Sequence, residues 1–179
     1  MNENEFIKIL RECDGHLIPS GDEIKLKKGT QVKITQSLGG DFTLYVNGNL
    51  VKIRGKDADA IGQKIKSEKK DNDSKVFDEK YIWDVLKTCY DPEIPVNIVD
   101  LGLVYDLKYH KNDLGNYEVT IKMTLTAPGC GMGPVIAQDV ESKVLSLGFV
   151  ADVLVEVVWE PLWNQSMMSE EAQLKLGML

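Results

Sequence analysis

Residues 66–75 interrupt the chain with a stretch that cannot contribute to a hydrophobic core. Seven of these ten residues are charged and none is apolar, in the sequence KSEKKDNDSK. Such a segment buries too little apolar surface to offset the entropy lost on ordering it. We therefore interpret residues 66–76 as a charged linker between a domain at residues 1–65 and a domain at residues 77–179. The alternative is an exposed loop or helix tail within one domain.

The composition limits the classes of function. The chain has 179 residues, 43% of them hydrophobic, enough for one ordinary core or two smaller ones. Its formal net charge of -7 argues against nucleic acid, because phosphate contacts require clustered Lys and Arg. No apolar run approaches the roughly 18 residues of a membrane span, and Glu3, Glu5 and Lys8 interrupt any signal peptide. We therefore expect a cytoplasmic protein that binds neither nucleic acid nor membranes.

The residues before the linker favour a small, mainly-β N-terminal domain. Short segments separated by turns are expected as strands at Glu23–Lys27, Thr30–Leu38, Asp41–Asn47 and Asn49–Arg54. The pair Asn47-Gly48 is typical of a tight hairpin turn. A short helical segment is expected from Asp57 to Ile65, with the Asp57 side chain as its N-terminal cap.

The residues after the linker predict the order αββαβ. The expected helices are Asp78–Tyr90, ended by Pro92 and Pro95, and Pro134–Leu147; the expected strands are Leu101–Tyr109, Tyr117–Leu125 and Val153–Trp159. The first two strands form a hairpin, and a further short helix follows Ser169. We therefore predict an α+β fold in which helices pack on a small mixed sheet.

The segment between the second strand and the second helix is the first candidate site, with the sequence Ala127-Pro128-Gly129-Cys130-Gly131-Met132-Gly133-Pro134. A cysteine close to a helix N-terminus is favoured as the thiolate. Gly129, Gly131 and Gly133 carry no Cβ, which permits a tight turn and a close approach to the sulfur. This pattern is typical of a metal ligand or a nucleophile. A buried structural thiol and a loop that binds an anion through its backbone are the alternatives.

The other cysteines are weaker candidates than Cys130. Three scattered cysteines are too few for a disulfide framework. Cys89 falls on the apolar stripe of its predicted helix, which favours core packing. Cys13 has acidic neighbours on both sides, which disfavour a thiolate. His16 and His110 lack the spacing of a metal motif.

An acidic, proline-rich segment, Asp91-Pro92-Glu93-Ile94-Pro95, is the second candidate site. Its two prolines make the backbone stiff. The Asp91 and Glu93 carboxylates can cap backbone amides, bind a hard cation or accept a proton. Capping is the ordinary role of such residues in a turn.

Three separated motifs resemble the metal-sulfur cluster biosynthesis domain of PaaD-like proteins. They are DPEIPVNIVDLGLVYDL, TLTAPGCGMGPVIAQDVESKV and WEPLWNQSMMSEEA, and the resemblance covers Phe77 to Gly177. The leading region carries ITQSLGG, GNL and DADA, which are similar to the extra N-terminal domain of SufT proteins. Nearly the whole chain therefore resembles a SufT-type iron-sulfur cluster assembly auxiliary protein.

The resemblance implies a non-enzymatic, auxiliary role in iron-sulfur cluster assembly or maturation. It implies Cys130 as the functional thiol, with Asp91 and Glu93 nearby. The implied cargo is an iron-sulfur cluster or iron, and the implied partners are the assembly machinery and client apoproteins.

A cluster normally takes about four protein ligands, whereas the chain offers one good candidate. We therefore expect Cys130 to contribute to a shared or transient site, either in a homodimer or against a partner's cysteines. An adaptor that binds no metal and a cysteine-dependent enzyme, which would need a positioned base, are the alternatives.

Overall fold

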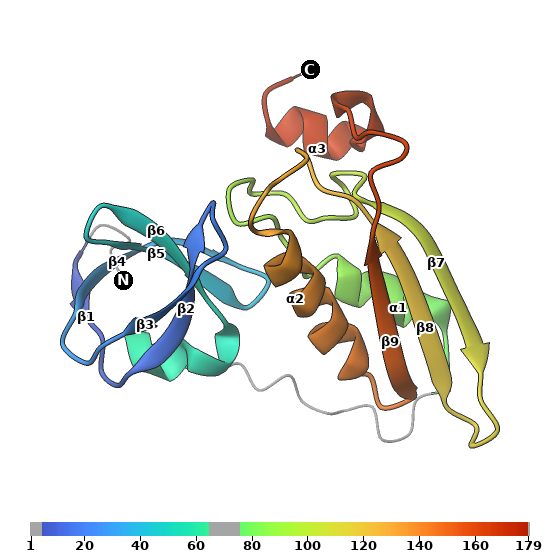
Figure 1. The fold of residues 1–179 in the computed structure, drawn as a ribbon, viewed down its shortest axis with the longest axis horizontal. Helices are drawn as coiled ribbons and strands as arrows, with labels where there is room; N and C mark the ends of the chain where they lie inside the picture. Colours follow the sequence, from blue (N-terminus) through green and yellow to red (C-terminus); the bar gives the residue numbers. More distant parts are fainter. Residues whose placement is uncertain (1–4, 65–75, 179) are drawn as a thin grey trace. The chain divides into compact units, whose positions relative to one another are not determined.

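The computed structural model describes residues 5–64 and 76–178. The chain divides into two compact units, Met1–Glu68 and Lys69–Leu179 (Figure 1). Residues 66–75 of the predicted linker lie outside the described residues. In the described part of the chain, none of the helices has both the length and the apolar character needed to cross a membrane.

The first unit is built on an antiparallel sheet with the strand order β1-β4-β5-β6-β2-β3. Its strands are β1 (Ile7–Lys8), β2 (Cys13–Ile18), β3 (Glu23–Leu26), β4 (Gln31–Leu38), β5 (Asp41–Val46) and β6 (Asn49–Ile53). The sequence did not predict β2, because Gly15 weakens its strand pattern. Gly15 is there for packing: a Cβ at this position would lie 2.6 Å from Val51 Cγ1.

A 3-10 helix, η1 (Gly55–Ile61), follows the last strand of the first unit. The predicted helix from Asp57 to Ile65 is therefore wrong in its bounds, and Asp57 is not its cap, because the capping position is Arg54 and no side chain caps it. Asp57 is used elsewhere: its Oδ1 accepts a hydrogen bond from Arg11 Nη2 at 3.0 Å. This contact ties η1 to the segment before β2.

The second unit has the predicted αββαβ order and a mixed sheet, which confirms the α+β fold class. Its elements are α1 (Glu79–Leu86), β7 (Val104–Lys111), β8 (Tyr117–Met123), α2 (Gly133–Leu145) and β9 (Val150–Val157), followed by η2 (Gln165–Met167) and α3 (Glu170–Lys175). The central strand β8 is antiparallel to β7 and parallel to β9. Helix α2 packs against β9 and also contacts α1.

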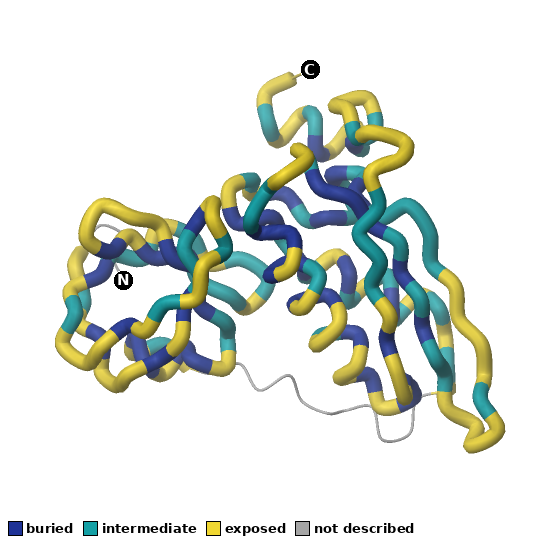
Figure 2. The backbone as a smooth tube through the Cα atoms, viewed as in Figure 1, coloured by how far each residue is buried: buried dark blue, intermediate teal, exposed yellow. Residues whose placement is uncertain are grey.

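The core of the second unit lies between the sheet and α2. Apolar side chains at helical spacing on α2 and at alternate positions on β8 are fully or almost fully buried, namely Ile136, Val140, Val144, Val119, Ile121 and Met123. Burying each of these side chains contributes about 1.5–3 kcal/mol. Figure 2 shows the burial along the chain, with buried stretches in α2 and β8 and an exposed turn between β7 and β8.

Helix α1 begins as predicted and ends earlier. The Asp78 side chain accepts a hydrogen bond from Lys80 N at 2.9 Å, so Asp78 is the N-terminal cap. The predicted end at Tyr90 is wrong, because the helix ends at Leu86. Cys89 N donates to Leu86 O at 3.0 Å, a bond of the 3-10 type that tightens the chain before Pro92 is reached.

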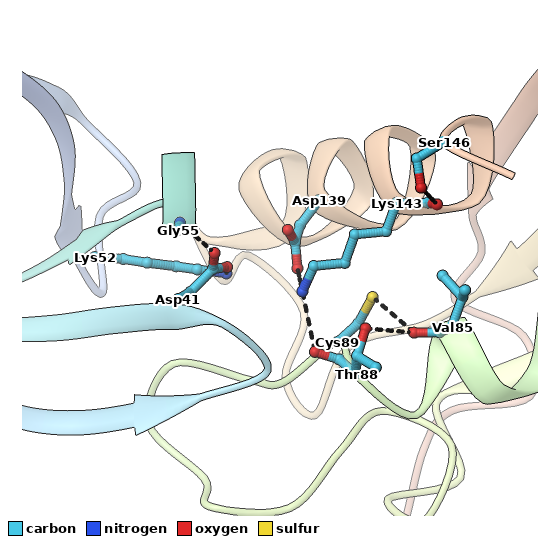
Figure 3. Close-up of polar contacts among 9 residues, drawn as sticks. All are labelled: Asp41, Lys52, Gly55, Val85, Thr88, Cys89, Asp139, Lys143 and Ser146. Carbon is cyan, nitrogen blue, oxygen red and sulfur yellow. Dashed lines mark hydrogen bonds and ion pairs between the residues drawn. The ribbon is translucent and has the colours of Figure 1, made fainter. Parts of the chain in front are cut away.

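A buried ion pair ties α2 to the residues after α1 (Figure 3). Lys143 Nζ lies 3.1 Å from Asp139 Oδ2 on the same helix and donates to Thr88 O at 3.0 Å. Thr88 lies three residues before Asp91, the first residue of the acidic proline segment. The position of that segment therefore depends on α2.

The C-terminal residues are anchored on the segment that leads into β7. Trp163 Nε1 donates to Leu101 O at 2.8 Å, and Ser169 N donates to Asp100 O at 2.8 Å. Gly102 directly follows these two anchoring residues and has φ +72, and a Cβ there would clash with the carbonyl group of Met167. The approach of the C-terminal residues therefore requires glycine at position 102.

We predict that Gly102→Ala lowers the free energy of unfolding of the second unit by about 3 kcal/mol or more. About 1 kcal/mol comes from the positive φ, and the rest from the clash with Met167. Gly115→Ala is the matched control: its φ is +86, but the only atom within 4 Å of the new Cβ is Lys111 Cε at 3.9 Å.

Urea unfolding followed by tryptophan fluorescence measures this difference. All three tryptophans belong to the second unit, so the signal reports on that unit alone. Equal losses of stability in the two variants would contradict the packing of the C-terminal residues described above.

Candidate functional site

Cys130 lies on the loop between β8 and α2 and is partly exposed, whereas Cys13 and Cys89 are buried. The side chain of Cys89 is fully enclosed and Cys13 is 5% exposed. Burial, followed by the charge of Asp57, raises the pKa of Cys13, which holds it as the thiol. Of the three cysteines in the chain, Cys130 is therefore the one that another molecule can reach.

The glycines around Cys130 have different physical roles. Gly129 has φ +79, and the space where its Cβ would lie is open. Gly131 has no positive φ. Gly133 is required for packing, because a Cβ there would lie 2.6 Å from Leu125 Cδ1. The predicted openness of the loop thus applies to Gly129, whereas Gly133 holds the start of α2 against the end of β8.

Backbone hydrogen bonds fold the loop into two successive turns. Cys130 N donates to Ala127 O at 3.4 Å, and Gly133 N donates to Cys130 O at 3.1 Å. Met132 precedes α2 without capping it through its side chain, and Pro134 follows in the first turn. Residues 127–129 are exposed. The outer side of this loop is therefore accessible up to Cys130.

The acidic proline segment forms a closed loop of its own. Tyr90 and Asn97 pair in an antiparallel bridge, and Ile98 N donates to Cys89 O at 2.9 Å. Asp91 is buried, and its Oδ1 accepts from Glu93 N at 2.8 Å, which is the ordinary capping role. Glu93 itself is exposed. One of the two candidate carboxylates therefore orders the turn and the other faces outward.

A polar network follows this segment, and it was missed by sequence reasoning. Asn97 Oδ1 accepts from Val99 N at 3.0 Å and from Asp100 N at 2.9 Å, and Asn97 Nδ2 donates to Asp100 Oδ2 at 2.6 Å. The spacing of Asn97 and Asp100 is the available signal, since Asn side chains commonly bond to backbone groups two or three residues on. The network connects the acidic proline segment to the anchored C-terminal residues through Asp100.

The structure does not combine the predicted site residues into a metal site. Among the described residues, which include Cys130, Asp91 and Glu93, no three His, Cys, Asp or Glu side chains are grouped closely enough to hold a metal ion.

Thr124 lies just before the cysteine loop, and among the described residues its side-chain hydroxyl has no hydrogen-bond partner. Its backbone N donates to Leu103 O at 2.8 Å, which extends the sheet beyond β8. Its Oγ1 is buried and has no hydrogen-bond partner within residues 5–64 and 76–178. Such a group costs about 1–3 kcal/mol, and no sequence pattern distinguishes it from the paired hydroxyl groups of other threonines.

Comparison with known proteins places these features in a family. The family model described as "Iron-sulfur cluster assembly protein" matches residues 79–157. The chain is 48% identical over 101 residues to an Fe-S protein maturation auxiliary factor of Porphyromonas gingivalis, covering 56% of this chain and 92% of that protein. It is 42% identical over 87 residues to the Fe-S protein maturation auxiliary factor SufT of Staphylococcus aureus, covering 49% and 94%.

A solved structure is also similar, the crystal structure of a domain of unknown function, DUF59, from Bacillus anthracis. It shares 40% identity and a TM-score of 0.49, and the match covers 56% of this chain and 92% of that chain.

The αββαβ unit with a cysteine loop before α2 thus defines a domain of the iron-sulfur cluster assembly class, and residues 79–157 lie within it. The chain belongs to the iron-sulfur cluster assembly protein family and is of the SufT type. Its role therefore lies in the assembly and maturation of iron-sulfur proteins, as the resemblance of the three motifs implied.

We predict one fast-reacting thiol per chain when the folded, reduced protein is treated with 5,5′-dithiobis(2-nitrobenzoic acid), and three after unfolding. The reason is that Cys130 is reachable, whereas Cys13 and Cys89 are buried. Cys130→Ser should abolish the fast phase and leave the two slow thiols. A fast phase that persists in this variant would contradict the assignment.

Proposed function

We propose that this chain is a non-enzymatic auxiliary factor that uses Cys130 to bind an iron-sulfur cluster transiently during its transfer to client proteins. The observation that carries the proposal is the placement of Cys130, the reachable cysteine, on an exposed loop beside the start of α2. Membership of the iron-sulfur cluster assembly family supports an iron-sulfur cluster or iron as the cargo. The relatives are named auxiliary factors, which supports a role without turnover of a substrate.

The cluster site is shared with another chain. A cluster takes about four protein ligands, and Cys130 supplies one of them. The remaining ligands come from a second copy in a homodimer or from the cysteines of a partner in the assembly machinery. Open space at Gly129 and the exposure of residues 127–129 leave room for that second surface.

We assign the acidic proline segment a supporting role in cluster binding and transfer. Asp91 holds the turn through Glu93 N, and the exposed Glu93 carboxylate acts as a docking acid or an oxygen ligand. Asp91→Asn retains an oxygen that can accept the same bond, so it removes the charge and keeps the turn. An Asp91→Asn, Glu93→Gln double variant with full iron uptake and full client activation would rule out this supporting role.

We propose that the protein acts in the cytosol, where thiols such as Cys130 are kept reduced.

We assign the recognition of a partner to the first unit. Deleting the first unit should weaken partner pull-down. An unchanged pull-down would count against this assignment.

We predict that Cys130→Ser reduces activation of an iron-sulfur client enzyme, in cells lacking the native protein, to the level of cells without the factor. The substitution replaces a soft sulfur ligand by a poor one and changes little else on an exposed loop. Ala127→Ser in the same exposed loop is the control and should retain full activation.

The readout is client activity per client protein, with the amount of folded variant checked in the same cells. Full activation by Cys130→Ser would contradict the proposal and would favour an adaptor that binds no metal.

A further inference from the structure

A cavity in the second unit lies apart from the cysteine loop in sequence. Its volume is about 520 Å³, and it is lined by Val76, Phe77, Asp78, Glu79, Tyr81 and Tyr109. Pockets of a few hundred Å³ are the usual size for small ligands and single inserted groups. Its lining combines aromatic rings with carboxylates, which is the composition that recognises organic cations.

The aromatic lining is held in place by ring packing. Phe77 stacks on Tyr117 at 3.7 Å between centroids and 12° between planes, and it contacts Tyr109 at 4.6 Å. Because Tyr117 covers one face of Phe77, the cavity meets its opposite face or its edge. Phe149 contacts Phe77 edge-on at 5.3 Å, which further fixes the ring. These rings therefore present a preformed wall.

Two hydrogen-bond donors orient the Glu79 carboxylate in this cavity. Glu79 Oε1 accepts from Trp83 Nε1 at 2.9 Å, and Glu79 Oε2 accepts from the Tyr109 hydroxyl at 3.1 Å. Each carboxylate oxygen can accept a second hydrogen bond, so capacity for a ligand remains. The hydrogen bond to Glu79, followed by burial and then by the Glu79 charge, raises the pKa of Tyr109.

The net charge of the second unit and the two carboxylates in the cavity lining favour a cation over an anion. Residues 76–179 contain 16 Asp and Glu residues and 7 Lys and Arg residues. The positive end of the α1 dipole opposes a cation, but the N-cap Asp78 and Glu79 in the first turn carry two negative charges, which outweigh its roughly half charge. The same aromatic cluster already holds one cation, since Lys111 Nζ lies 5.9 Å from the Tyr117 centroid.

We propose that this cavity binds an arginine side chain presented by a partner protein. A guanidinium group is planar, so it stacks on Phe77 or Tyr109 while donating to the Glu79 carboxylate, whereas an ammonium group has no flat face. The site uses no atom of Cys130 and does not depend on the cluster chemistry proposed above. It gives the second unit a docking point separate from the cysteine loop.

The test is a titration of the full-length protein with N-acetyl-arginine amide, followed by NMR at the Trp83 indole N-H, which is bonded to Glu79. We expect a saturable shift of this cross-peak with a dissociation constant of order 1–10 mM, as suits a single side chain. N-acetyl-citrulline amide has nearly the same shape without the charge, so it should cause no saturable shift. Absence of saturation with arginine, or an equal response to citrulline, would overturn the proposal.

Substitutions at Glu79 and Tyr109 distinguish the contribution of the carboxylate charge to arginine binding from that of the aromatic ring. Glu79→Gln and Tyr109→Leu should each weaken arginine binding at least about fivefold, whereas Tyr109→Phe keeps the ring and should bind within about twofold of the native protein. Binding by Glu79→Gln as tight as by the native chain would overturn the proposal. Cys130→Ser should bind arginine normally, so failure here is distinguishable from failure of the cluster proposal.

Discussion

The close contact between Gly133 and Leu125 determines how the second unit presents its cysteine. Leu125 is buried just beyond β8, and Gly133 is the first residue of α2. Since no Cβ fits between them, the helix starts directly against the end of the strand. The residues between these two points have to leave the core as a tight loop, and Cys130 lies on the part of that loop that reaches the surface.

The other end of α2 extends this dependence to the acidic proline segment. Lys143, paired with Asp139, holds the carbonyl group of Thr88, so the segment that begins at Asp91 leaves from a point fixed on α2. Removing one partner of a buried ion pair typically costs about 3–5 kcal/mol. The pair therefore gives the helix a single position relative to the residues after α1, and one helix organises both candidate segments.

Periodic patterns and cap residues were sufficient to predict most of the fold. The αββαβ order, the Asp78 cap and the strands after Glu23 follow from apolar spacing and turn residues, and all are present. The pattern failed where packing overrides local preference. Gly15 interrupts the strand pattern of β2, and glycine is needed there because a Cβ would clash with Val51. Asp57 was expected to cap a helix, whereas its carboxylate accepts a hydrogen bond from Arg11 and η1 already starts at Gly55.

The candidate site also combines features that the sequence predicted with features that it did not. Cys130 was identifiable from its loop and from the burial expected of Cys89. The anchoring of Trp163 on Leu101 joins residues 62 positions apart, which local patterns do not reveal. The network from Asn97 to Asp100 is local, and the spacing of these two residues was the signal that sequence reasoning overlooked. The unpaired Thr124 hydroxyl is a property of the folded surroundings.

The central claim is that Cys130 supplies one ligand of a shared cluster. It is tested most directly by anaerobic reconstitution of the full-length protein with iron and sulfide in the presence of glutathione, a small thiol that can provide the missing ligands. Iron per chain and the absorption spectrum are measured for the native protein and for Cys130→Ser. We expect a cluster on the native protein and none on the variant. Equal iron on both proteins, or none on the native protein, would contradict it.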